Sequence, residues 1–298
     1  TVGVVEGIAE ATAAITKVFS GALSDWVGRR KVLVVTGYAF SALTKPFFPL
    51  AQSMLAVLTA RFLDRVGKGV RDAPRDALIA DVTPAGLRGA AFGLRQSLDT
   101  VGAFLGPLLA TALMLLWHED FRAVFWVAIV PGLASVALLI LAVHEPAASR
   151  PAERRGNPLR IDSLRRLGRM YWWIVLVGAL FTLARFSEAF LVLRAAQLGI
   201  PAAWVPVVMV AMNLVYSLTA YPVGRWSDRI GHRALLAAGM LVLLAADVVL
   251  AWATSGPGVI AGTLLWGLHL GLTQGLLAAM VADASPAELR GTAFGCFN

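Results

Sequence analysis

Cysteine is almost absent from this sequence, and so are clusters of metal ligands and catalytic groups. Cys296 is the single cysteine among 298 residues, so no disulfide can form within the chain. The four histidines are scattered, and no pair of them has metal-ligand spacing. We also find no nucleophile–base pair and no phosphate-binding loop. The sequence therefore predicts no metal site, no cofactor and no enzymatic activity.

Charged residues are scarce as well, at 15% of the chain, while 58% of the residues are hydrophobic and the mean hydropathy is +0.73. A soluble domain carries about a quarter charged residues. Here the apolar residues recur in runs of about 18–25, which match the ~20 residues that a helix needs to cross a bilayer. Lipid offers no hydrogen bonds to an irregular backbone, so each run is expected to be a helix. The chain is therefore predicted to be an integral membrane protein with many spans.

These runs predict nine near-complete membrane spans and the start of a tenth. Basic residues gather in alternate loops, for example at 29–31 and 225–233, and the intervening turns are nearly free of them. This positive-inside pattern makes the basic loops cytoplasmic. It also explains the net charge of +8 without a nucleic-acid partner. The predicted spans are 2–22, 32–51, 54–80, 90–117, 122–143, 171–195, 201–223, 234–253 and 256–281, and the tenth begins near 289.

Two motifs occur twice, at nearly the same separation. The stretch Asp81–Gly93 returns as Asp283–Gly295, 202 residues later. The stretch Gly21–Arg30 returns as Gly224–Arg233, 203 residues later. Two unrelated motifs that share one offset indicate a duplicated half.

The stretch Gly21–Arg30, together with Lys31, resembles the cytoplasmic motif between the second and third helices of the major facilitator superfamily. The copy at Gly224–Arg233 strengthens the resemblance, although Trp26, Trp226 and His232 depart from the family pattern. Glycines let helices approach and turn tightly, and Asp25 can pair with arginines or cap the next helix. These charges could instead only set topology, but topology requires neither the aspartate nor the glycine spacing. The predicted cytoplasmic gate comprises Gly21, Asp25, Gly28, Arg29, Arg30, Gly224, Asp228, Gly231 and Arg233.

The span 54–80 is unusually charged, and its stretch Arg61–Gly69 resembles part of the family's fourth helix. The resemblance implies that Arg61 is the basic residue tied to proton coupling in drug–proton antiporters, although Arg65 and Lys68 depart from the pattern. Charges within a span are costly and normally face a water-filled cavity or a partner. We expect a cavity at Arg61, Asp64 and Arg65, and a merely cytoplasmic position for Arg71, Arg75 and Asp76.

The next span carries a glycine pattern similar to the antiporter motif of the family's fifth helix. The pattern consists of Gly93, Gly102, Gly106 and Pro107, and it departs from the motif at its end, where Ala110 and Thr111 replace two glycines. The resemblance implies a hinge, while the spacing of Gly102 and Gly106 equally suits close helix packing.

Further polar residues at membrane depth are candidates for proton coupling or for the cavity. Glu6 and Glu10 share one face of the first span and are either proton carriers or half-solvated acids near the outer surface. Arg95 and Asp99 are one turn apart and are expected to form a local ion pair. Arg185 and Glu188 either pair with each other or face the cavity. With Arg61 as the partner that tunes them, the candidate proton sites are Glu6, Glu10, Asp64 and Glu188.

The resemblance implies an all-α integral membrane fold of two pseudo-symmetric six-helix halves with the binding site at mid-membrane. On that plan the chain runs from the second helix into the eleventh, with halves at 1–144 and 171–298 and a cytoplasmic linker at 145–170. The implied protein is a monomer in a prokaryotic inner membrane that moves a small solute by alternating access, with protons driving its export. Uptake by symport is the alternative, and a membrane-embedded enzyme or sensor is a remote one.

Overall fold

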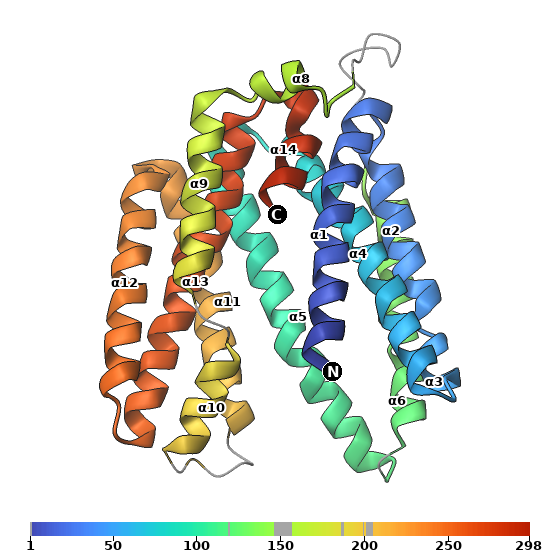
Figure 1. Cartoon of the computed structure of the whole chain (residues 1–298), viewed down its shortest axis with the longest axis vertical. Coiled ribbons are helices and arrows are strands. Elements are labelled where there is room, and N and C mark those ends of the chain that lie inside the picture. Colours follow the sequence, from blue (N-terminus) through green and yellow to red (C-terminus); the bar gives the residue numbers. More distant parts are fainter. Residues whose placement is uncertain (1, 119, 146–156, 186–187, 199, 201–204) are drawn as a thin grey trace. The chain divides into compact units, whose positions relative to one another are not determined.

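The computed structural model describes residues 2–118, 120–145, 157–185, 188–198, 200 and 205–298, and within these residues all regular structure is helical (Figure 1). The all-α prediction is therefore confirmed. Up to residue 145 the helices are α1 (Val2–Val27), α2 (Arg30–Thr44), α3 (Phe47–Leu50), α4 (Met54–Val82), η1 (Ala85–Leu87), α5 (Arg88–Leu116), α6 (Phe121–Val127) and α7 (Ile129–Ala142). They continue with α8 (Ile161–Arg165), α9 (Gly168–Ala184), α10 (Ala189–Gln197), α11 (Val205–Ile230), α12 (His232–Trp252), α13 (Gly256–Ala284), η3 (Ala287–Leu289) and α14 (Arg290–Phe297).

Every predicted span coincides with one helix or with two consecutive helices. Five helical segments of the described chain are long and apolar enough to cross a membrane. They are Ala85–Leu116, Phe121–Ala142, Val207–Ile230, His232–Trp252 and Gly256–Ala284. Many large apolar side chains on such helices are exposed, among them Leu115, Leu141 and Trp252 at 77–80%. A bilayer accounts for this exposure, because lipid is the solvent for these faces.

Three predicted spans are interrupted rather than continuous. The span 32–51 divides into α2 and α3 at Pro46, which has no N–H group to continue the helical ladder. The span 122–143 divides between α6 and α7, and Pro131 in the first turn of α7 likewise lacks a donor. The span 171–195 divides between α9 and α10, where the sequence 185–188 holds neither glycine nor proline.

The contacts divide the chain into two units, and each combines segments that are far apart in the sequence. Unit 1 comprises Thr1–Val82, Leu109–Trp172 and Val281–Asn298, and unit 2 comprises Thr83–Leu108 and Trp173–Met280. In unit 1, α4 packs on both α1 and α2, and α14 packs on α1 (Figure 1). These units differ in membership from the repeat-based halves 1–144 and 171–298, which remain a prediction. Residues 146–156 of the predicted linker lie outside the described residues.

The core of unit 2 is apolar and is built by α10 to α13. Met212 on α11, Leu243 on α12 and Trp266 on α13 are almost completely buried in it. The helices also approach closely: a Cβ atom added to Gly267 would lie 2.4 Å from the Met212 carbonyl oxygen. Since the lipid tails are as apolar as these side chains, such close packing supplies much of what holds membrane helices together.

Candidate functional site

Asp25, in the last turn of α1, caps the N-terminus of α14. Its carboxylate accepts hydrogen bonds from the Gly291 N–H at 2.9 Å and from the Thr292 N–H at 2.6 Å. The Thr292 hydroxyl group donates a third, at 2.7 Å. The first N–H groups of a helix have no partner within the helix, and the positive end of its dipole attracts an anion. We call this arrangement of Asp25, Gly291 and Thr292 the first latch.

The two helices of the first latch can meet because glycine faces glycine at their crossing. A Cβ atom added to Gly21 would lie 2.1 Å from the Gly291 carbonyl oxygen, and one added to Gly291 would lie 2.4 Å from the Gly21 carbonyl oxygen. Ser24, which is fully buried, turns its hydroxyl group back to the Gly21 carbonyl oxygen at 2.7 Å. No larger side chain would fit at the crossing without separating the backbones.

Arginines surround the first latch. Arg30 lies 3.2 Å from Asp25 and 3.1 Å from Asp81, and it donates to the Ala287 carbonyl oxygen at 2.7 Å. Arg290 pairs with Asp81 at 2.7 Å. Arg30 therefore connects the latch aspartate to a second carboxylate, at the end of α4. The side chain of Arg30 is only 8% exposed, so these pairs lose less strength to water and salt than surface pairs do.

The same geometry occurs in unit 2. Asp228, near the end of α11, accepts hydrogen bonds from the Gly89 N–H at 2.7 Å and the Ala90 N–H at 2.8 Å, in the first turn of α5. A Cβ atom added to Gly224 would lie 2.1 Å from the Gly89 carbonyl oxygen. Ser227 donates to the Gly224 carbonyl oxygen at 2.6 Å. We call Asp228, Gly89 and Ala90 the second latch; Ala90 supplies no hydroxyl group and Asp228 is only half-buried.

The partner that Asp25 caps differs from the predicted one. Of the two possibilities, the pairing with an arginine is present, but the capped helix is α14 and not the next helix α2. The capping role predicted for Asp25 at the start of α2 belongs to Glu145, because the Glu145 carboxylate accepts a hydrogen bond from the Arg30 N–H. Gly28 and Gly231 serve the turns after the latch helices, where positive φ angles of 70° and 90° favour glycine. The side chains of Arg29 and Arg233 are exposed.

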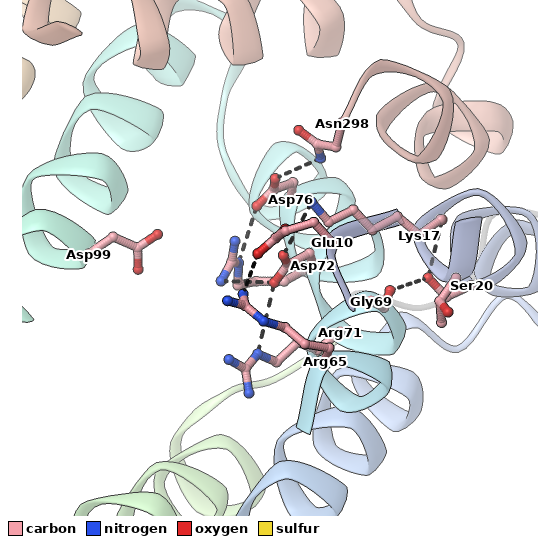
Figure 2. A network of polar contacts seen from close by, with 12 residues as sticks. Glu10, Lys17, Ser20, Arg65, Gly69, Arg71, Asp72, Asp76, Asp99 and Asn298 are labelled. Carbon is pink, nitrogen blue, oxygen red and sulfur yellow. Dashed lines mark hydrogen bonds and ion pairs between the residues drawn. The ribbon is translucent and has the colours of Figure 1, made fainter. Parts of the chain in front are cut away.

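Charged side chains of α4 form ion pairs with α1 (Figure 2) and with Lys45 at the end of α2, all within unit 1. Arg65 contacts Glu10 at 2.7 Å, and Lys17 lies 3.8 Å from Asp72. Asp64 pairs with Lys45 at the end of α2, at 3.3 Å, rather than with the predicted partner Arg61. The side chain of Arg61 is exposed, and that of Glu6 lies outside the described part of the chain.

The charged residues near the C-terminal end of α4 are buried by another helix. Asp76, for which a cytoplasmic position was predicted, is 2% exposed, and its level relative to the membrane stays a prediction. It pairs with Arg75 at 3.2 Å and accepts a hydrogen bond from the Asn298 amide at 3.4 Å. The reason is that α14 packs on α4 at this level, which the order of the sequence does not reveal.

Unit 2 carries its own polar residues. Arg95 and Asp99 form the predicted ion pair, at 2.8 Å. Arg185 immediately follows α9, and its guanidinium group faces the side-chain amide of Gln274 on α13. Glu188 immediately precedes α10 and is exposed. The position of Arg185 and Glu188 at an interruption between helices, rather than inside a continuous span, was not predicted.

Comparison with known proteins places this arrangement in a family. The family model described as Major Facilitator Superfamily matches residues 1–298. The chain belongs to the major facilitator superfamily. An uncharacterised MFS-type transporter of Methanocaldococcus jannaschii is 31% identical over 304 residues, covering 100% of this chain and 75% of the relative.

A second relative is the multidrug resistance protein MdtH of Photorhabdus laumondii. It is 29% identical over 216 residues, which cover 71% of this chain and 51% of the relative. Among solved structures, the fucose:proton symporter FucP of E. coli matches with a TM-score of 0.77 and 18% identity, over 98% of this chain and 80% of FucP. That likeness shows the fold. The superfamily identifies this chain as a multi-pass membrane protein and a secondary transporter of small molecules, not an enzyme.

The glycines that resemble the superfamily's antiporter motif do not all have close neighbours. A Cβ atom added to Gly93 would lie 2.4 Å from the Ala220 carbonyl oxygen on α11, so Gly93 has the predicted packing role. Within the described part of unit 2, no atom lies within 4 Å of a Cβ atom added to Gly102 or Gly106. For these two glycines the packing role stays a prediction as well. A hinge at Gly102, Gly106 and Pro107 stays a prediction.

Proposed function

We propose that the protein exports a small solute across a prokaryotic inner membrane by alternating access, and that protons entering the cell drive the export. It acts as a monomer. The observation that carries the proposal is that each latch joins the two repeated halves of the sequence. The first latch joins α1 to α14, and the second joins α11 to α5. Any movement of one half against the other at the cytoplasmic side has to break both.

The strength of the latches suits a reversible gate. Each hydrogen bond contributes about 0.5–1.5 kcal/mol net, and one to a charged group about 1.5–3 kcal/mol. The first latch makes three such bonds and the second makes two. When the latches open, hydrogen bonds to water and to other groups replace part of the lost hydrogen-bond free energy. The net cost of opening is therefore a few kcal/mol. Differences of this size between two conformations are those that a ligand or proton can shift.

Proton coupling is assigned to acids at membrane depth, namely Glu6, Glu10, Asp64 and Glu188. Glu10 is the best supported, because it contacts Arg65 at 2.7 Å between α1 and α4. Protonation of Glu10 would leave Arg65 without that counterion, and a change of this kind links proton binding to conformation. The name of the multidrug resistance relative MdtH supports export. Symport, as in the name of FucP, is the alternative.

The test uses the full-length protein in inside-out membrane vesicles with an imposed proton gradient. Panels of organic cations, sugars and organic acids are added, and a fluorescent dye follows the gradient. We expect a compound to dissipate the gradient with the wild-type protein. The Glu10→Gln variant should lose this response by roughly tenfold or more, since it cannot carry the proton. Asp162→Asn, at a side chain that is 78% exposed, is the matched control and should respond normally.

Two outcomes would contradict parts of the proposal. If no compound dissipates the gradient while one of them accumulates in whole cells that express the protein, export is wrong and uptake replaces it. If a compound is exported equally by wild type and Glu10→Gln, the transport assignment stands but Glu10 is not a proton carrier.

A further inference from the structure

Two exposed arginines lie on either side of the turn between α8 and α9, at the end of α9 that is predicted to be cytoplasmic (Figure 1). Arg165 is the last residue of α8, and Arg169 lies in the first turn of α9. In the part of the chain that the structure describes, no carboxylate pairs with either side chain. Both guanidinium groups are therefore available to an anion from outside the protein. We call these two residues the arginine corner.

The exposed face of α9 changes in character along the helix. Arg169 is followed on this face by Trp172 and Trp173, which are 43% and 52% exposed. Leu176 comes next, at 47%. With a rise of 1.5 Å per residue, the tryptophans lie roughly 5 Å and the leucine roughly 10 Å beyond the arginine along the helix axis. The order of charge, indole ring and aliphatic chain is the order from the headgroups of a bilayer to its hydrocarbon, over a headgroup layer that is roughly 5–7 Å thick.

The opposite face of α9 is packed, which fixes the direction of the exposed face. Tyr171 is fully buried, and its hydroxyl group donates to the Ala293 carbonyl oxygen on α14 at 2.9 Å, within unit 1. Arg169 precedes Tyr171 by two residues and so lies on roughly the opposite side of the helix. The hydrogen bond of Tyr171 therefore keeps Arg169 on the outer side. It also joins the arginine corner to the helix that Asp25 caps.

A phospholipid phosphate is the anion that fits this arrangement. A guanidinium group presents a planar fork of N–H groups that matches a phosphate. Trp172, Trp173 and Leu176 lie directly beyond the arginine, where the glycerol and acyl parts of a phospholipid would contact them. A nucleic acid or an acidic soluble protein has no acyl chain to cover these side chains.

The positive-inside pattern alone does not require this arrangement. That pattern needs basic residues somewhere in the loop. Here the arginines have no carboxylate partner among the described residues, and Arg169 shares the exposed face of one helix with two tryptophans. Arg160 shows the contrast, because it precedes α8 and lies 3.9 Å from Asp162.

We propose that the arginine corner binds the headgroup of an anionic phospholipid of the cytoplasmic leaflet. Arg165 and Arg169 hold the phosphate, and Trp172 and Trp173 contact the glycerol region. Each arginine near the membrane surface favours an anionic lipid by roughly fivefold. The lipid is a partner of the protein beyond the proposed transport function, and its binding does not require transport. Because Tyr171 joins the corner to α14, the bound lipid also stabilises unit 1.

A competition between two lipids tests this inference. The full-length protein is reconstituted in vesicles that contain equal amounts of phosphatidylglycerol and phosphatidylcholine with identical acyl chains. It is then released in a neutral detergent, and the lipids that stay bound are counted by native mass spectrometry. We expect the wild-type protein to retain at least roughly fivefold more phosphatidylglycerol than phosphatidylcholine. Added inorganic phosphate should not displace the lipid, because it has no glycerol or acyl part.

Matched arginine variants distinguish a binding site from a general attraction to negative charge. Arg165→Gln and Arg169→Gln should each reduce the preference severalfold. Their thermal unfolding without added lipid should match that of the wild type, because both side chains are exposed. Arg160→Gln removes the same charge from a side chain of the same segment that is 70% exposed, and it should leave the preference unchanged. Equal losses in all three variants would show a diffuse attraction and overturn the proposed site.

The remaining outcomes separate this inference from the transport proposal. Equal retention of the two lipids by the wild type, or displacement of phosphatidylglycerol by inorganic phosphate, overturns the lipid site and leaves the proposed export untouched. A preference for phosphatidylglycerol with the expected variant effects, but no transport in vesicles, supports the lipid site and overturns the proposed export.

Discussion

Replacing Gly21 by alanine is expected to abolish transport, while the same substitution at Gly86 leaves it unchanged. The added Cβ atom at Gly21 would lie 2.1 Å from the Gly291 carbonyl oxygen. A backbone atom cannot move aside as a flexible side chain can, so α1 and α14 have to separate. Overpacking of this kind costs about 1–3 kcal/mol or more. This cost is comparable to the free energy that the hydrogen bonds of the first latch contribute. The closed conformation therefore loses most of its free-energy preference over the open one.

Gly86 is the matched control for this prediction, because it lies in η1 and no described atom lies within 4 Å of an added Cβ atom. The measurement is the initial rate of solute transport in vesicles at equal protein expression. Gly224→Ala should behave like Gly21→Ala, since its Cβ atom would lie 2.1 Å from the Gly89 carbonyl oxygen. Full activity of Gly21→Ala would show that the close helix crossing is not required.

Replacing Asp25 by asparagine is expected to reduce transport far more than the same change at Asp228. The asparagine amide would turn an N–H group toward the N–H groups of α14, and Arg30 would lose one of its two carboxylate partners and keep Asp81. Each unsatisfied donor costs about 1–3 kcal/mol, so the equilibrium between closed and open should shift by tenfold or more. Asp228 accepts two hydrogen bonds and is half-buried, whereas Asp25 accepts three, pairs with Arg30 and is 6% exposed.

The comparison is made on the Michaelis constant and maximal rate of transport for wild type, Asp25→Asn and Asp228→Asn. The maximal rate should fall in the order wild type, Asp228→Asn, Asp25→Asn. Glu288→Gln is a suitable control, because its side chain is 39% exposed and lies 3.8 Å from the exposed guanidinium group of Arg166. Equal losses in the two aspartate variants would contradict the greater strength of the first latch.

The sequence contained the information for both latches but not their pairing. The repeat identified Asp25 and Asp228 as equivalent, and it identified the stretches 81–93 and 283–295 as equivalent. Each aspartate binds the glycine of the distant copy: Asp25 binds Gly291, and Asp228 binds Gly89. A short-range interpretation assigns Asp25 to the next helix, since local caps are the usual ones. The shared offset of the two motifs was the signal for a crossed pairing.

Other parts of the site were beyond prediction for physical reasons. Asp64 has three basic neighbours within four residues on its own helix, so nothing local indicates its pairing with Lys45, which follows another helix. The interruption between α9 and α10 carries no glycine or proline, so only tertiary structure reveals it. The burial of Asp76 depends on α14, which follows it by more than 200 residues. In contrast, the helix positions followed from the length of the apolar runs alone, because the thickness of the bilayer sets how long each run has to be.

The labelling rate of a buried thiol tests most directly whether the latches open during transport. Ser24 and Ser227 are 0% and 1% exposed. Ser24 donates to the Gly21 carbonyl oxygen and Ser227 to the Gly224 carbonyl oxygen, at the helix crossing beside each latch. Ser24→Cys and Ser227→Cys are made separately in a Cys296→Ser background, and a maleimide is applied from the cytoplasmic side. We expect slow labelling at rest and a parallel, several-fold acceleration of both sites when solute and a proton gradient drive turnover. Unchanged labelling at both sites while transport proceeds would show that the latches stay closed, and would contradict the proposed gate.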